Sequence, residues 1–490
     1  MRQHWIGGRM TAGRRAGIVV LDPATGETLD TVARGTVADV ESAVRAAREA
    51  FAEWRFLPGV EKGALLHEVA RRMRSRHHEL ATTMTREGGK PYCENFDEVE
   101  WSAACFDYYA EVGRDARGSS IPPVAPHQVN FTIKEPYGVV VAIVPWNYPL
   151  LLLSWKVAPA LAAGNTVIIK PSEETPLATL DLARAFSALP AGTVNIVNGT
   201  GSEVGEALVT HPGTDLIALT GSLATGQRVG ALCAREIKKC HLELGGNDPF
   251  IVFPDADLEV AARGGVWAAF LNAGQVCTSA KRFFVFDEIY DAFVERAVRF
   301  TKSLRLGNGL DPKTDVGPLI NARQLADVEA RVAEAVAAGA RVLTGGRRSR
   351  KKKQGFFYEP TVLVDVRPEM RIVATETFGP TMPIQRVRGV DEAIAMANAQ
   401  DYGLGANIYT NNMEWAMTAM ERITAGTFWI NDPLTDNEAG PFGGMKKTGH
   451  SRELGVEGLD EFRETKHVHL DWKQEIKSYW YPYEKYNRSR

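Results

Sequence analysis

The middle of the chain alternates short apolar runs with longer amphipathic segments, and this alternation restricts the fold more than any other feature. Runs such as GVVVAIV (138–144) are continuous and rich in β-branched residues, which is typical of strands buried on both faces. Strands joined through helices require right-handed crossovers, so the pattern predicts a parallel sheet whose ligands bind at the carboxyl ends of the strands. The expected strands are 138–144, 166–170, 194–197, 216–220 and 238–244, and the expected helices are 39–54, 150–163, 176–189 and a segment after 226.

A second region of alternating elements runs from about residue 254 to residue 430 and predicts a second α/β domain. Between two glycine-containing stretches it carries the basic run RRSRKKK (347–353). We interpret this run as a solvated hairpin tip rather than as a nucleic-acid patch. The expected helices of this region are 257–270, 288–303 and 321–338, and its expected strands are 282–286, 342–345 and 427–431.

Charge and composition exclude several functional classes. The formal net charge of −3 gives no field that would attract nucleic acid or an anionic membrane. The longest apolar run, 139–153, is interrupted by two prolines and an asparagine and is too short to span a bilayer. The five cysteines form no C-x-x-C pair, so we expect no zinc site or other metal site and no disulfide framework. Free thiols and an N-terminus without an apolar signal segment predict a cytoplasmic protein.

Cys277 lies in FLNAGQVCTSAKRFF, where its small and polar neighbours would let other groups approach the sulfur. It could be a nucleophile, a metal ligand or an ordinary small residue. Glu243 ends a predicted strand in LELGGN and could act as a general base if its pKa were raised. Asn147 could donate to an oxyanion, while Lys170 and Glu173, in KPSE, could hold ribose hydroxyls. Taken singly, each residue has an ordinary alternative as a turn former or a solvated charge.

Two glycine-rich stretches were considered as phosphate sites. GTGSEVG (199–205) does not have the G-x-G-x-x-G spacing of a dinucleotide fingerprint. GSLATG (221–226) is better placed, because it follows a buried strand and opens a helix. Ser222 and the first backbone N–H groups could receive a phosphate at the positive end of that helix. The alternative is an ordinary turn with a serine cap.

Taken together, the motifs resemble those of the aldehyde dehydrogenase superfamily. The matching stretches occur in the family's order and cover nearly the whole chain. The tetrapeptide WNYP and the aromatic tail SYWYPY are most similar to the betaine-aldehyde and aminoaldehyde branch. The matching stretches are PWNYPLLLLSWKVAPALAAGNTVIIKPSEETP, LTGS, LELGGNDPFIV, NAGQVCTS, ETFGP and PFGGMKKTGHSRELG.

This resemblance implies a mechanism and a set of catalytic residues. Cys277 would attack the aldehyde, and Asn147 with the Cys277 backbone N–H would form the oxyanion hole. After hydride transfer to nicotinamide, Glu243 would activate the water that hydrolyses the thioester. Lys156 and Glu453 match a buried pair that would relay protons.

The resemblance also implies NAD as the cofactor. Glu173 favours NAD over NADP, because a carboxylate accepts ribose hydroxyls and repels a 2′-phosphate; NADP is the weaker alternative. The residues expected to contact the cofactor are Val144, Pro145, Trp146, Asn147, Lys170, Ser172, Glu173, Gly201, Gly221, Ser222, Leu244, Gly245, Glu376 and Phe378.

The expected aldehyde pocket contains Tyr148, Trp155, Thr278 and Phe442. Its aromatic rings could hold an ammonium group by cation–π attraction, and the acidic loop 431–442 could add a carboxylate at the pocket mouth. We therefore expect betaine aldehyde or an ω-aminoaldehyde as substrate. Neutral aliphatic or aromatic aldehydes are the alternative. Three other classes of protein fit less well. A coenzyme A-acylating relative would lack Glu243, and a cysteine hydrolase would need a histidine beside Cys277. A non-catalytic relative would not retain the whole set of catalytic residues.

By the same resemblance the chain divides into three parts. A Rossmann-like NAD-binding domain covers 1–116 and 138–245, and a catalytic domain covers 246–445. A small β element, 117–137 with 460–490, would bridge subunits into a homodimer or homotetramer. The aromatic residues near the C-terminus would leave a large apolar area in water unless a partner subunit covered them.

Overall fold

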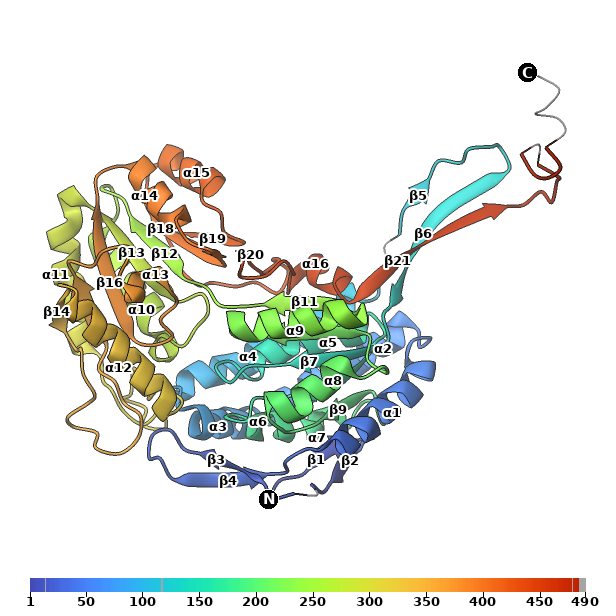
Figure 1. Cartoon of the computed structure of the whole chain (residues 1–490), viewed down its shortest axis with the longest axis horizontal. Helices are drawn as coiled ribbons and strands as arrows, with labels where there is room; N and C mark the ends of the chain where they lie inside the picture. Colours follow the sequence, from blue (N-terminus) through green and yellow to red (C-terminus); the bar gives the residue numbers. More distant parts are fainter. Residues whose placement is uncertain (14, 116–117, 478, 484–490) are drawn as a thin grey trace.

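Two sheets of seven strands each organise the computed structural model of the chain, which describes residues 1–13, 15–115, 118–477 and 479–483. Each sheet forms the centre of one lobe, and a separate three-stranded arm projects from the lobe that contains the N-terminus (Figure 1). Helices and parallel strands together give the predicted α/β fold. No helix in the described ranges combines the length and apolar character needed to cross a bilayer.

The first sheet has the order β11-β10-β7-β8-β9-β1-β2, and the strands from β11 to β9 are parallel. Alternate residues of its strands pack on opposite faces: Val139 and Val141 contact the layer of α1, α8 and α9, whereas Val140 and Ala142 contact that of α2, α4 and α5. Burial on both faces explains why the strands read as continuous apolar runs. The strands are β1 (His4–Ile6), β2 (Arg9–Thr11), β7 (Val139–Ile143), β8 (Thr166–Lys170), β9 (Val194–Ile196), β10 (Leu216–Thr220) and β11 (Lys239–Glu243), and the helices are α1 (Val37–Trp54), α2 (Gly59–Ser75), α3 (His77–Gly88), α4 (Tyr92–Val112), α5 (Leu151–Ala162), α8 (Glu206–Thr210) and α9 (Leu223–Glu236).

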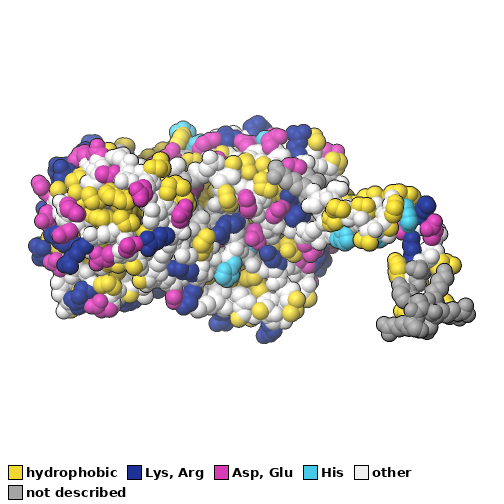
Figure 2. Space-filling view, turned by 90° about the horizontal axis from the view of Figure 1, so that it is seen from above, with side chains coloured by type: hydrophobic (Ala, Val, Ile, Leu, Met, Phe, Trp, Pro, Cys, Tyr) yellow, Lys and Arg dark blue, Asp and Glu magenta, His cyan; other side chains and the backbone are white. Residues whose placement is uncertain are grey.

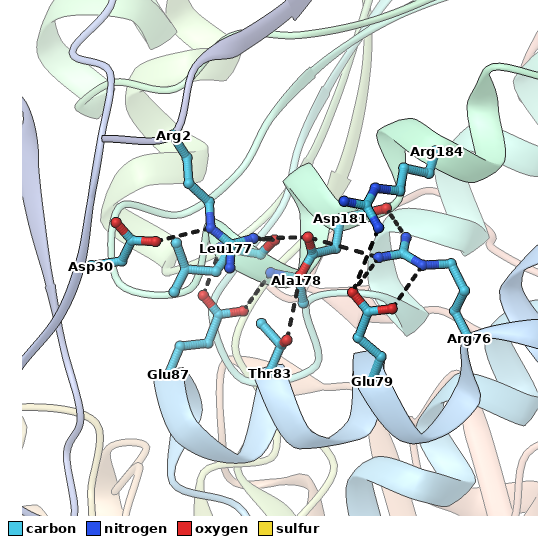
Figure 3. Close-up of polar contacts among 10 residues, drawn as sticks. All are labelled: Arg2, Asp30, Arg76, Glu79, Thr83, Glu87, Leu177, Ala178, Asp181 and Arg184. Carbon is cyan, nitrogen blue, oxygen red and sulfur yellow. Dashed lines mark hydrogen bonds and ion pairs between the residues drawn. The ribbon is translucent and has the colours of Figure 1, made fainter.

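The prediction of a single helix over 176–189 was wrong. Two short helices, α6 (Leu177–Asp181) and α7 (Ala183–Phe186), occupy this segment. The guanidinium of Arg76 donates to the Asp181 carbonyl oxygen, so this oxygen is engaged outside the helix (Figure 3). A helix whose carbonyl bonds elsewhere loses its regular ladder at that turn.

A buried carboxylate fixes the start of α6. Glu87 accepts hydrogen bonds from the backbone N–H groups of Leu177 (2.6 Å) and Ala178 (2.9 Å), which would otherwise lack partners at the helix N-terminus (Figure 3). Arg2 adds a bond to Asp181 at 2.8 Å. These contacts hold the end of the loop that leads from β8 to α6, where the KPSE motif lies.

The second sheet has the order β14-β15-β16-β13-β12-β18-β19 and is parallel except for β14. Helices α10, α11 and α12 cover one face, while α14 and α15 cover the other. The basic run 347–353 is a largely exposed turn between β14 and β15, as predicted. The strands are β12 (Asp248–Val252), β13 (Ala280–Phe286), β14 (Arg341–Thr344), β15 (Thr361–Val364), β16 (Thr381–Val387), β18 (Gly405–Tyr409) and β19 (Thr427–Ile430), and the helices are α10 (Leu258–Phe270), α11 (Tyr290–Ser303), α12 (Ala322–Ala337), α13 (Arg371–Ala374), α14 (Val390–Asn398) and α15 (Met413–Arg422).

The projecting arm contains β5 (Ser120–Ile121), β6 (Gln128–Pro136) and β21 (Arg463–Asp471), with β21 paired to β6 along its whole length. Strand β21 follows α16 (Gly455–Asp460) in the chain, and the arm stands clear of both lobes (Figure 1). Residues 116–117, 478 and 484–490, which include parts of the expected bridging element and aromatic tail, lie outside the described residues.

Candidate active site

The loops that carry the sequence motifs meet between the two lobes, at the carboxyl ends of the first sheet. Asn147 Nδ2 donates to the Gln275 carbonyl oxygen at 3.1 Å, which joins the PWN loop to the cysteine loop. Gly246 packs so closely on this loop that a Cβ atom there would lie 2.5 Å from the Cys277 carbonyl oxygen. A Cβ on Gly274 would lie 2.2 Å from the Gly379 carbonyl oxygen, so the ETFGP loop closes the other side. Three distant motifs therefore surround Cys277.

A strained turn presents the cysteine. Before Cys277, Asn272 and Ala273 both adopt left-handed backbone conformations, with φ of 47° and 56°. Asparagine tolerates this region, whereas alanine rarely enters it. The turn is held by the Asn272 side chain, which donates to the Asn147 carbonyl oxygen at 3.2 Å. Strain of this kind is held in place where the surrounding structure fixes a functional loop.

Cys277 opens onto a cavity of about 310 Å³. All four residues expected in the aldehyde pocket line this cavity, as does Asn147. Of the three acids in the loop 431–442, Asp436 and Glu438 line it and Asp432 does not. Sequence reasoning missed several lining residues, most of them from elements far from Cys277 in the chain, namely Asp97, Trp101, Leu151, Leu152, Trp267, Leu271, Val276, Leu434, Thr435, Asn437 and Leu454.

The Cys277 thiol is protonated at rest. Burial raises its pKa to about 12, with Lys281 opposing this shift and Asp248 adding to it. Lys281 was missed by sequence reasoning, although a lysine within the buried strand AKRFFVF was a signal; its ammonium donates to the Val276 carbonyl oxygen at 2.5 Å. A thiol with so high a pKa needs a base to remove its proton when it attacks.

Glu243 is a buried carboxyl group without a hydrogen-bond partner on either oxygen among the described residues. Burial raises its pKa well above the usual value, and the charge of Glu453 raises it further. Glu243 is not among the residues that line the cavity. A raised pKa is what a carboxylate needs to act as a general base near neutral pH.

Lys156 and Glu453 form a fully buried ion pair that acts on Glu243. The Lys156 ammonium contacts Glu453 Oε1 and donates to Thr220 Oγ1 at 2.5 Å. His241, to which sequence reasoning gave no role, lies on the other side of the same carboxylate. The expected Lys156–Glu453 contact is therefore present, within a larger cluster.

A helix N-terminus forms one part of the expected cofactor site. Ser222 caps α9, and its hydroxyl accepts from the Thr225 N–H at 3.3 Å. A Cβ on Gly226 would lie 2.4 Å from a methyl group of Leu244, so glycine lets α9 approach the end of β11. Gly221 donates its N–H to the Glu243 carbonyl oxygen at 3.1 Å. The free N–H groups of this helix end fit a phosphate.

At the end of β8, Lys170 is almost fully buried. Its ammonium donates to the Pro171 carbonyl oxygen at 2.7 Å and lies 3.6 Å from Glu173 Oε2. Burial lowers the pKa of Lys170, and Glu173 works against that shift. An ammonium beside a carboxylate fits ribose hydroxyls, which both donate and accept. Three further expected contacts, Val144, Pro145 and Ser172, lie beside this pair on the ends of β7 and β8.

The ETFGP loop forms the remaining part of the expected cofactor site. A Cβ on Gly245 would lie 2.2 Å from Glu376 Oε2, so only glycine permits this approach. Trp146 and Phe378 meet edge to face with their ring centroids 5.4 Å apart. Gly201, by contrast, begins the π-helix η1 (Gly201–Gly205) in open space, where nothing in the structure requires glycine. The other expected cofactor residues lie at the end of β8, in the loops that follow β7, β8, β10 and β11, or in the ETFGP loop.

Comparisons with known proteins agree with this geometry. Residues 10–468 match the model of the aldehyde dehydrogenase family. The chain is 40% identical to betaine aldehyde dehydrogenase of Bacillus subtilis, over 93% of this chain and 94% of that protein. It is 38% identical to glutarate-semialdehyde dehydrogenase of Pseudomonas putida, over 95% of this chain and 97% of that protein.

Among solved structures, betaine aldehyde dehydrogenase of Staphylococcus aureus in complex with NAD+ superposes with a TM-score of 0.95 at 34% identity, covering 98% of this chain and 97% of that one. The chain therefore belongs to the aldehyde dehydrogenase family and is an oxidoreductase.

Proposed function

We propose that the protein oxidises a cationic aldehyde, either betaine aldehyde or an ω-aminoaldehyde, to the carboxylic acid with NAD. The observation that carries this proposal is the lining of the cavity beside Cys277. Aromatic rings from Tyr148, Trp155 and Phe442 form its walls, and Asp436 and four more acidic or amide side chains lie among them. Within the described residues, no lysine or arginine lines it.

This lining discriminates between classes of aldehyde. Aromatic faces and carboxylates both attract an ammonium group, the former by up to about 2 kcal/mol when water is excluded. A semialdehyde carries a carboxylate at the end opposite its aldehyde group. In this cavity that carboxylate would face the negative charges of the lining acids and no lysine or arginine among the described residues. Lys90, which lies 3.5 Å from the Tyr148 ring centroid, does not change this balance because it is paired with buried Glu98.

The chemistry follows from the positions of the site residues. The Cys277 sulfur bonds to the aldehyde carbon, the thiol proton passes through water to the Glu243 carboxylate, and the carbonyl oxygen becomes an oxyanion. Asn147 has two amide N–H groups; one is fixed on Gln275, so the second is available to the oxyanion together with the Cys277 backbone N–H. Water then attacks the resulting thioester, Glu243 takes the water proton, and the C–S bond breaks to release the acid.

We propose NAD as the cofactor on the chemistry of the residues described above, namely Lys170 with Glu173, the α9 N-terminus at Ser222, and Glu376. When bound, NAD supplies the acceptor for the hydride that leaves the aldehyde carbon. Glu173 is half-exposed beside Lys170, where its charge would repel the 2′-phosphate of NADP. NADP is therefore the weaker alternative.

Neutral aldehydes are the second candidate, because the aromatic walls alone bind apolar groups. The test compares kcat/KM for betaine aldehyde and 4-aminobutanal with that for hexanal and phenylacetaldehyde, with succinate semialdehyde as the anionic control. We expect the cationic pair to be preferred and the anion to be poorest. A ten-fold preference for the neutral pair, about 1.4 kcal/mol in the transition state, would overturn the cationic assignment.

We further propose that the protein is a homodimer or a dimer of such dimers. The arm exposes Val129, Ile133 and Leu470, and Figure 2 shows hydrophobic side chains along it. Near its end Trp472 and Tyr481 are also exposed, at 57% and 80%. A second copy would cover these surfaces. The free cysteines support a cytoplasmic location, which cell fractionation would test.

A further inference from the structure

His241 is a buried imidazole beside the proposed base. It precedes Glu243 by two residues on β11, so both side chains point to the same face of the strand. Its ring is fully buried and stacks on Phe462, with centroids 5.5 Å apart and planes 21° from parallel. Neither ring nitrogen has a hydrogen-bond partner among the described residues. Leaving a buried imidazole unpaired destabilises the fold, which calls for an explanation.

The nearest charged group to this imidazole is Glu453. His241 Nε2 lies 3.5 Å from Glu453 Oε1, the same oxygen that the Lys156 ammonium contacts. Glu453 Oε2 has no partner in the described part of the chain. Although burial works to raise the pKa of Glu453, the positive charge of Lys156 and the contact with His241 hold it below the usual value. The carboxylate therefore lies between a lysine and an imidazole, with capacity left for one more proton donor.

We propose that His241 is a positioning residue for thioester hydrolysis, which holds at Nε2 the proton that leaves Glu243 by way of Glu453. This inference rests on the proposed function. The attacking water loses a proton to Glu243, and the proton passes to the Glu453 carboxylate and then to His241 Nε2. The imidazolium formed there pairs with the Glu453 carboxylate until it gives up the proton to solvent, and Glu243 is again free to act as a base.

The advantage of a third group is electrostatic. A proton left on Glu243 would block the next turnover, and a proton left on Glu453 would break the pair with Lys156. An imidazolium beside Glu453 instead adds an opposite charge to the carboxylate. The other charged groups that act on Glu243 and Glu453 are Lys156 on α5, Arg452 on a loop and Glu461 just after α16. Glu453 in turn acts on Cys105 and Tyr109 on α4, on which Glu438 and Glu457 also act.

Two variants separate proton handling from packing. His241→Phe keeps a ring against Phe462 and removes both nitrogens, whereas Phe462→Leu removes the stacking and keeps the imidazole. Each is assayed with saturating NAD and betaine aldehyde for the pre-steady-state burst of NADH and for steady-state kcat between pH 6 and pH 9. We expect His241→Phe to keep the burst within two-fold, to lose about ten-fold in kcat and to shift the pH–rate profile. Phe462→Leu should keep the wild-type profile.

His241→Gln decides the case if His241→Phe does not fold. It retains a polar side chain but cannot take up the proton, so it should also lose kcat and shift the profile. An unchanged kcat and pH profile in either His241 variant would overturn the proposal, as would an equal loss of burst and turnover. A wild-type enzyme that forms no NADH with any aldehyde would instead reject the proposed function.

Discussion

Replacing Asp436 with Asn should lower kcat/KM for cationic aldehydes and leave neutral aldehydes nearly unaffected. Asp436 lines the cavity, and its charge acts on both Tyr148 and Cys277, where it contributes to the raised pKa of each group. Its side chain is open to solvent, so its attraction for an ammonium group is screened and worth at most about 1 kcal/mol. This corresponds to a loss of up to about five-fold for betaine aldehyde.

The same residue predicts a pH dependence. The protein around the cavity raises the pKa of Asp436 to about 7, although solvent reaches the side chain. A carboxyl with this pKa is about one-tenth ionised at pH 6 and about nine-tenths ionised at pH 8. The ratio of kcat/KM for betaine aldehyde to that for hexanal should therefore rise over this range in the wild type. It should stay flat in Asp436→Asn, since betaine aldehyde keeps its charge at every pH.

Asp432→Asn is the matched control, because Asp432 belongs to the same loop and does not line the cavity. Taking the ratio of two substrates cancels any effect on the Cys277 thiol, which both substrates share. A flat ratio in the wild type, or an equal loss in the Asp432 variant, would refute the reasoning about Asp436.

Three further predictions concern the base, the fold and the assembly. Glu243→Gln should give a burst of NADH followed by very slow turnover, because hydrolysis needs the base more than acylation does; unchanged steady-state turnover would remove Glu243 from this role. Glu87→Gln should lower the free energy of unfolding by about 1–3 kcal/mol, because one amide oxygen cannot replace two acceptors at α6; an unchanged melting temperature would contradict this. Sedimentation at micromolar concentration should show a dimer or tetramer, and a monomer would argue against a partner on the arm.

Much of the first sheet could be predicted, because strands buried on both faces are continuous apolar runs. The break between α6 and α7 at Leu182 could not be predicted, because it depends on Arg76, which lies more than 100 residues earlier in the chain. In the second sheet β12, β15, β16 and β18 were not assigned from the sequence. They are as deeply buried as the predicted strands, but no distinctive motif marks most of them.

Some residues of the candidate site could likewise be predicted from the sequence, and others could not. Residues within motifs, such as Cys277 and Asn147, could be named from the sequence because the motifs come as ordered sets. Asp97 and Trp101 could not, because α4 reaches the cavity only through tertiary packing. Nor could the sequence show which acid of the loop 431–442 lines the cavity, since that depends on the direction of each side chain.

The central claim is that an aldehyde is oxidised while bound covalently to Cys277. Intact mass and peptide mapping of Glu243→Gln, quenched after mixing with NAD and betaine aldehyde, test this most directly. We expect the mass of one acyl group per chain, located on the peptide that contains Cys277, with NADH formed in equal amount and no adduct in Cys277→Ala. NADH formation without an adduct on Cys277, or turnover by Cys277→Ala, would contradict the account.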